Sequence, residues 1–265
     1  MNIFFHELKA YRKSTIIWTA SLVLIIALFM SFYPAFAKDA DDFKKIMEGY
    51  PEGIRNAIGF NLGNFFTILG FYCFPLSFIT LCGAIQGMNL GTSIVSKEVR
   101  EKTADFLLTK PVTRTAVLTS KLLAAFFSIV ITNVIYLVVT IIVTFQVKTD
   151  AFSVKILIML SLTIFFIQLM FLALGIMISV IVPKIKSVLS VSLTTVFAFY
   201  FLGMFSSTTG EESKRYISPF KYFDTAYIIK HSGYEVSFLV AGAVVIILAV
   251  AVSYFVYLKK DIHAV

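Results

Sequence analysis

The chain has 265 residues, of which 58% are hydrophobic and only 14% are charged, and its mean hydropathy is +0.89. These values lie outside the range of soluble domains and exclude an ordinary cytosolic globular protein. The formal net charge of +8 fits the orientation of an integral membrane protein better than binding to nucleic acid. We therefore expect an all-α integral membrane protein, with a single transmembrane domain over residues 1–265.

The N-terminal residues predict an amphipathic helix over 2–13. Phe4, Leu8 and Tyr11 fall on one side of this helix, and its charged residues fall elsewhere. Such a helix lies along a membrane interface, and we expect it to turn into the first span. The apolar run that follows is longer than the core of a cleavable secretory signal, so we expect it to be retained.

Six apolar segments predict six membrane spans. A bilayer core about 30 Å thick needs about 20 apolar residues of helix. The segments that meet this requirement are about 14–36, 64–92, 116–145, 155–182, 187–207 and 236–258. With both termini inside, the short joint PKIKS at 183–187 and the terminal Lys259 and Lys260 obey the positive-inside rule. We therefore expect both termini in the cytoplasm of a multi-pass plasma membrane protein.

Two segments on the opposite side, 40–60 and 218–236, mix aromatic and polar residues. In the first, Phe43, Ile46 and Tyr50 recur at helical spacing. Both segments predict short helices that either lie at the outer interface or re-enter the membrane. Re-entrant backbone requires protein or water to satisfy its polar groups, and the sequence leaves the two alternatives open.

The segment KEVREKTADFLLTKPVTR, residues 97–114, holds eight charged residues between two apolar stretches. At about 100° per residue, its charged residues Glu98, Glu101, Lys102 and Asp105 share one arc of a helix, and Val99, Thr103, Phe106 and Leu107 share another. Pro111 disfavours helical geometry in the residue before it, so we expect the helix to end near Lys110. The pattern predicts a short amphipathic helix over 97–109 on the cytoplasmic side. It is either a solvated linker lying on the headgroups or a docking helix for a soluble partner.

The centres of the six segments contain no Asp, Glu, Lys, Arg or His. Ion-coupled carriers usually need such groups to carry or relay charge, so we expect the energy for any transport to come from elsewhere. The polar residues near these centres are Gln86, Asn89, Asn133, Gln168, Thr194 and Thr195. Interhelical hydrogen bonds explain them more economically than contacts to a substrate.

The second span carries a stripe of small residues, because Gly83, Gly87 and Gly91 lie four residues apart. This spacing lets two helix backbones approach closely, either within the subunit or at a dimer interface. Pro75 lies in the same span and predicts a kink toward its outer half.

We find no motif that indicates catalysis or metal binding. The sequence has no GxxxxGK[ST] phosphate loop, no HExxH pair and no intramembrane Asp pair. Its three histidines are scattered, and Cys73 and Cys82 fall on opposite faces of one predicted helix. We therefore expect a protein that is not an enzyme by itself and holds no metal.

A wider stretch around the charged segment, SKEVREKTADFLLTKPVTRTAVLTSKLL at 96–123, resembles the membrane subunits of ATP-binding cassette (ABC) transporters of the type-two, exporter-like superfamily. The positions that match the first cytoplasmic loop of that family are Glu98, Thr103, Leu107, Leu108, Pro111, Arg114 and Lys121. A Gly often precedes the Thr in the family, whereas Lys102 stands here. PEGIRNAIG at 51–59 and SPFKYFD at 218–224 also look like the external segments of the family.

The resemblance implies that 97–109 is a coupling helix, which seats in a groove of a separate cytosolic ATPase. Its contact residues would be Glu98, Val99, Arg100, Glu101, Thr103, Phe106 and Leu107. The chain itself would then need no cofactor, because ATP and Mg²⁺ would bind to the partner. A second copy or a related permease would complete a dimer in the lipid of a bacterial plasma membrane.

In relatives, spans one, two and five line the central path. The resemblance therefore makes Phe197, Phe199, Tyr200 and Phe201 candidate pathway residues, although structural packing is the simpler explanation for any single one of them. An uncharged aromatic path would suit amphipathic or lipid-like cargo, moved outward. Two other classes fit the same spans: a self-sufficient channel or secondary carrier, and an immunity or sensor subunit that transports nothing.

Overall fold

The computed structural model describes residues 3–38, 49–51, 67–100, 112–149, 151–182, 184–209 and 212–259, and all regular structure in these residues is helical. The elements in chain order are α1 (Ile3–Ser31), α2 (Tyr33–Lys38), α5 (Ile68–Arg100), α7 (Arg114–Val147), α8 (Val154–Ile181), α9 (Val188–Thr209), the 3-10 helices η1 (Glu212–Ile217) and η2 (Pro219–Lys221), α10 (Thr225–His231) and α11 (Val236–Lys259). Six of these helical segments are long and apolar enough to cross a membrane.

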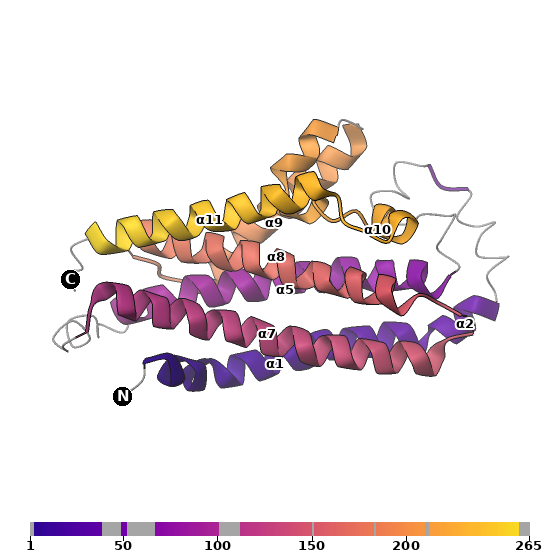
Figure 1. Cartoon of the computed structure of the whole chain (residues 1–265), viewed down its shortest axis with the longest axis horizontal. Coiled ribbons are helices and arrows are strands. Elements are labelled where there is room, and N and C mark those ends of the chain that lie inside the picture. Colours follow the sequence, from indigo (N-terminus) through magenta and orange to yellow (C-terminus); the bar gives the residue numbers. More distant parts are fainter. Residues whose placement is uncertain are drawn as a thin grey trace.

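The six long helices form an elongated bundle (Figure 1). Ile3 and Lys259 lie at the same end of this bundle, here called the termini end, together with the end of α5 and the start of α7. The other end, here called the far end, holds α2 and α10. Both ends of the chain lie at the same end of the bundle because the number of spans is even.

Helices α5 and α8 form the centre of the bundle. In their most apolar windows 72% and 61% of the residues are buried, against 22% in each of α1, α9 and α11. The outer faces of the peripheral helices expose apolar side chains, among them Ile17 and Leu24 of α1, Val138 of α7 and Ile247 of α11. Exposed apolar surface of this extent requires hydrocarbon as its solvent.

Local sequence explains most of the helix boundaries. The hydroxyl oxygen of Thr113 accepts a hydrogen bond from the backbone N–H of Ala116 and begins α7, as expected for a helix cap. The carboxylate of Asp224 accepts hydrogen bonds from two amides of α10, which ends at His231 and is followed by Ser232 in the left-handed conformation (φ 50°). Pro34 has no N–H to continue the hydrogen-bond pattern of α1, and the chain turns at Phe32 before α2 begins.

Two expectations about boundaries differ from the structure. The N-terminal segment 2–13 was expected to turn into the first span, but α1 runs without a break from Ile3 to Ser31, because no Pro or Gly interrupts it. The second span was expected to end near residue 92, but α5 continues through Pro75 and on to Arg100. Charged side chains after residue 96 limit how far the apolar stretch extends, but they do not end a helix.

The two segments expected at the outer interface have different outcomes. Residues 218–236 contain the short helices η2 and α10, in agreement with the sequence. Of the segment 40–60, only residues 49–51 lie within the described part of the chain. Phe43 and Ile46 are therefore outside it.

Candidate functional site

The predicted coupling segment lies at the termini end, between the last turn of α5 and the first turn of α7 (Figure 1). Glu98, Val99 and Arg100 belong to the last turn of α5. The other four predicted contact residues, Glu101, Thr103, Phe106 and Leu107, lie outside the described residues. The beginning of the segment is therefore a direct extension of the most buried helix in the bundle.

A buried ion pair lies beside this segment. The ammonium nitrogen of Lys121 in α7 lies 3.9 Å from a carboxylate oxygen of Glu7 in α1, and it donates a 2.5 Å hydrogen bond to the backbone carbonyl of Ile94 in α5. Both charged side chains are buried, with Lys121 1% and Glu7 4% exposed. Three helices therefore meet at one charged group.

The burial of Lys121 differs from what the sequence indicated. The resemblance placed Lys121 among the positions that match a cytoplasmic loop, and such a loop is expected to contact water. The structure instead surrounds it with α1 and α5. Sequence reasoning also missed Glu7 as its partner, since an isolated acid on an amphipathic helix gives no sign of the helix that it contacts.

Further contacts tie the same region together. The hydroxyls of Tyr11 in α1 and Ser93 in α5 are 3.0 Å apart, and the ring of Phe4 meets that of Phe127 in α7 edge to face at 5.6 Å. Thr119 bonds Tyr254 of α11 at 2.7 Å. Polar and aromatic contacts therefore join four helices at the termini end.

A chain of hydrogen bonds crosses the middle of the bundle. The side chain of Gln86 in α5 donates to Thr132 in α7 at 3.0 Å, and Thr132 also bonds Thr19 of α1 at 2.9 Å. Gln168 in α8 donates to the amide oxygen of Gln86 at 2.9 Å and accepts from Asn133 at 2.5 Å. This arrangement agrees with the expectation of interhelical hydrogen bonds for Gln86, Asn133 and Gln168. We call the five linked side chains the central network.

The central network leaves little capacity for binding a substrate. Gln86, Thr132 and Gln168 are buried, and each amide group already has partners on a neighbouring helix. Groups that are satisfied within the bundle hold helices together rather than recognise cargo. The other three polar residues expected in the spans, Asn89, Thr194 and Thr195, do not belong to this network.

The glycine stripe of α5 faces α8 of the same chain. A Cβ atom added to Gly87 would lie 2.5 Å from the carbonyl oxygen of Gln168, and one added to Gly91 would overlap the carbonyl oxygen of Leu172. Gly83 faces Ile164, and Gly175 of α8 faces the backbone of Met88 in return. The stripe is therefore used in packing within the subunit, and it brings Gln86 and Gln168 close enough to bond.

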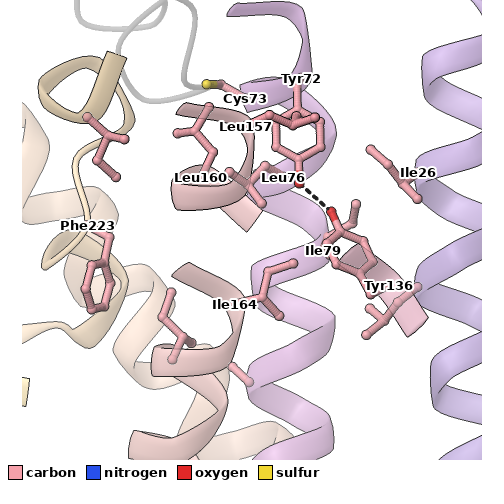
Figure 2. Packing of buried hydrophobic residues seen from close by; sticks show 14 of the residues in the cluster. Ile26, Tyr72, Cys73, Leu76, Ile79, Tyr136, Leu157, Leu160, Ile164 and Phe223 are labelled. Atoms are coloured by element: carbon pink, nitrogen blue, oxygen red, sulfur yellow. Dashed lines mark hydrogen bonds between the residues drawn. The ribbon is translucent and has the colours of Figure 1, made fainter. Parts of the chain in front are cut away.

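A second polar cluster lies in the apolar core nearer the far end (Figure 2). The hydroxyl of Tyr72 in α5 lies 2.8 Å from that of Tyr136 in α7 and 2.8 Å from that of Ser161 in α8. Figure 2 shows the hydrogen bond between Tyr72 and Tyr136 among apolar side chains of the core, which include Leu76 and Leu157. All three polar residues are buried, so this cluster also joins three helices and satisfies its own hydroxyls.

The four candidate pathway residues of α9 divide into two pairs. Phe197 and Phe201 are exposed, and their rings stack at 6.1 Å. Phe199 meets the ring of Phe171 in α8 at 5.9 Å, and Tyr200 meets Phe220 of η2 at 5.5 Å. Only Phe197 and Phe201 therefore face away from the chain, where a cargo or a partner could reach them.

The far end contains a compact group, here called the far-end clamp, made of Arg215, Lys221, Glu235 and Phe238. The guanidinium of Arg215 donates to both carboxylate oxygens of Glu235, at 2.6 and 3.2 Å, and to the backbone carbonyl of Lys221. It also lies 4.2 Å from the ring centroid of Phe238. The clamp fixes the connection that follows α9 onto the start of α11.

Burial changes the acid–base properties of two groups near the clamp. It lowers the pKa of Lys221, an effect that the nearby Asp224 partly opposes and Arg215 reinforces. It raises the pKa of Tyr234 to about 12, and the Tyr234 hydroxyl donates to the carbonyl of Met159 in α8 at 2.7 Å. We therefore expect Tyr234 to stay protonated near neutral pH, with its hydroxyl bound to α8.

Replacing Arg215 with Gln should destabilise the far end. The change removes a bidentate ion pair whose side chains are about one fifth exposed, so we expect a loss of about 1–2 kcal/mol in the free energy of unfolding. Thermal unfolding in detergent micelles measures it. Lys230→Gln, at an exposed cation of α10, is the matched control, and equal midpoints for the two variants would refute the role of the clamp.

No three His, Cys, Asp or Glu side chains gather into a possible metal site within the described ranges. Cys73 is buried and Cys82 is half-buried, and neither forms a disulfide. The polar groups described above join helices to one another.

These features define the class of the protein. Six apolar helices with lipid-compatible outer faces, joined by buried polar clusters, make it a multi-pass helical membrane protein. Residues 1–262 match the family model described as ABC-2 family transporter protein. The chain therefore belongs to the ABC-2 family, whose members are membrane subunits of ABC transporters, are generally not catalytic themselves and associate with an ABC ATPase. No individual curated protein and no solved structure matches the chain.

Proposed function

We propose that this membrane subunit exports an amphipathic or lipid-like cargo, driven by a separate cytosolic ATPase that docks on the segment between α5 and α7. The termini end is then the cytoplasmic end, and a second copy or a related permease completes the transporter. ATP and Mg²⁺ bind to the ATPase, and this chain needs no cofactor of its own.

The position of the charged segment is the observation that carries the proposal. It connects α5, which ends at the termini end, to α7, which begins there. Helix α5 runs from this segment through the centre of the bundle. A push on the segment would therefore reach α8 through the glycine contacts and α7 through the central network. A rigid path of this kind suits a subunit that receives mechanical work from outside the membrane.

The charges in the described spans support an external source of energy. The buried pair Glu7–Lys121 lies near the termini end, whereas the central network consists of neutral amides and hydroxyls. A carrier driven by protons or sodium usually places ionisable groups near mid-membrane. This contrast favours an ATP-driven subunit over a self-sufficient carrier.

The proposed path and dimer interface involve the face of α1, α5 and α9. Phe78 of α5 is exposed and stacks on Phe29 of α1 at 6.3 Å, and Phe197 and Phe201 of α9 are exposed as well. An uncharged aromatic surface suits cargo with a substantial apolar part. Phe199 and Tyr200 would support this surface from behind rather than contact cargo.

Changing Phe106 to Asp tests the docking segment. In liposomes that contain this chain, its partner permease where one is required, and the ATPase, we expect cargo-stimulated ATP hydrolysis and export to fall at least tenfold, because a carboxylate cannot fill an apolar groove. The six spans should fold unchanged. Phe106→Leu, which keeps the position apolar, is the control.

Three results would contradict the proposal. Full export by the Phe106→Asp complex would remove the docking role from this segment. Cargo flux through the chain without any ATPase would favour a channel or carrier, and tight ATPase binding without cargo movement would favour an immunity or sensor subunit.

A further inference from the structure

The buried Glu7–Lys121 pair is placed where motion of α5 and α7 could pass to α1. Ile94, whose carbonyl accepts from Lys121, lies six residues before the end of α5, and Lys121 lies seven residues after the start of α7. At about 1.5 Å per residue, each is roughly 10 Å from the helix end next to the docking segment. Both helices therefore reach the same ammonium group within two turns of that segment.

Helix α1 joins this group through Glu7. One carboxylate oxygen of Glu7 lies 3.9 Å from the Lys121 ammonium, and the other accepts no hydrogen bond within the described part of the chain. In the same turns of α1, Tyr11 hydrogen-bonds to α5 and Phe4 packs against α7. The first three turns of α1 are thus held by two helices through one ion pair and two neighbouring contacts.

The energetics of a buried pair favour concerted movement. Separating the two charges without water would leave each of them uncompensated in a medium of low dielectric constant. A surface pair would break and re-form freely, but this one is shielded from solvent on both sides. When α5 and α7 shift, α1 therefore moves with them unless the ion pair breaks and the three helices separate.

We propose that Glu7 and Lys121 are positioning residues, which make the termini ends of α1, α5 and α7 move as one body during the ATPase cycle. This assignment rests on the proposed function, because the motion is supplied by the ATPase. The pair contacts neither cargo nor nucleotide. Its effect is to set how much transport each hydrolysed ATP produces.

The first test uses the chain alone, in lipid nanodiscs, and follows hydrogen–deuterium exchange. Glu7→Gln keeps the shape of the side chain but removes its charge, so we expect amides 3–13 to exchange at least tenfold faster while those of α8 are unchanged. Lys9→Gln, at an exposed cation of the same helix, should change neither. Equal protection of α1 in the Glu7→Gln variant would overturn the assignment and leave the proposed function intact.

The second test measures transport per ATP in the reconstituted complex. Lys121→Met should lower this ratio at least fivefold, whereas Lys121→Arg, which keeps the charge and a donor, should retain most of it. Lys121→Met also leaves Glu7 as an unpaired buried charge, so it should lower the amount of assembled complex. The double variant Glu7→Leu/Lys121→Met removes both buried charges and should return that amount to the wild-type level. Its transport per ATP should stay as low as that of Lys121→Met.

This last outcome separates positioning from simple stabilisation. If the double variant recovers both the assembled complex and full transport per ATP, the pair only stabilises the fold and the assignment is wrong. If the wild-type chain never responds to the ATPase, the proposed function itself fails and the assignment falls with it.

Discussion

Replacing Gly87 with Ala is expected to push α5 away from α8 and to lower the free energy of unfolding by about 1–3 kcal/mol, the usual cost of overpacking. The added Cβ would lie 2.5 Å from the carbonyl oxygen of Gln168. A backbone carbonyl cannot move aside without moving its whole helix. Alanine is favoured over glycine by about 1 kcal/mol in a helix, so the net loss measures how closely the two backbones must approach.

Gly242→Ala in α11 provides the matched control within a span. The nearest atom to a Cβ there is the sulfur of Met170 at 3.3 Å, at the flexible end of a side chain. We expect this variant to be as stable as the parent or more stable in a titration with SDS followed by circular dichroism. If Gly87→Ala unfolds at the same SDS fraction as Gly242→Ala, the close contact between α5 and α8 is not a determinant of stability.

The glycine stripe also shows what the sequence could and could not predict. Its period identified a close helix contact, because glycines four residues apart lie on one face. The single sequence did not identify α8 as the partner, because a lone glycine such as Gly175, the only glycine of that span, does not show which helix it contacts. Close packing within the subunit and packing at a dimer interface produce the same pattern, and only the fold distinguishes them.

The number of spans was predictable for a simple reason. Hydrocarbon excludes charged side chains and unsatisfied backbone, so length and hydropathy together identify helices that cross it. Helix ends were less predictable, as α5 shows by continuing to Arg100. Hydropathy indicates where a helix leaves the hydrocarbon and enters water. The helix itself can continue beyond that point until a capping residue or a proline ends it.

Buried polar contacts were the least predictable part of the candidate site. Composition indicated that Gln86 and Gln168 would bond between helices, since amides in hydrocarbon need partners. It did not indicate that Lys121 is buried, because its neighbours in sequence differ from its neighbours in space. Glu7 and Tyr72 likewise gave no sign of their partners, which lie on other helices.

Changing Gln168 to Leu should loosen the junction of α5, α7 and α8. The substitution leaves the amide oxygen of Gln86 without its donor and removes an acceptor from Asn133. Hydrogen bonds between membrane helices contribute up to about 1.7 kcal/mol each, and a stranded buried group costs about 1–3 kcal/mol. We expect a loss of about 2 kcal/mol in the same SDS titration. Because α5 begins the proposed path of force, transport per ATP should fall as well.

A double-mutant cycle with Gln86→Leu determines whether the two amides act together. In each single variant one amide group of the pair loses its hydrogen-bond partner, whereas the double variant contains neither amide group. The free energy of unfolding of the double variant should therefore be about 1 kcal/mol higher than the sum of the two single losses predicts. Thr194→Val, at an exposed threonine of α9, controls for the change from polar to apolar within a span. Strict additivity of Gln86→Leu and Gln168→Leu would mean that their bond contributes nothing measurable. The glycine contacts and the apolar side chains around them would then hold α5 against α8 without help from this hydrogen bond.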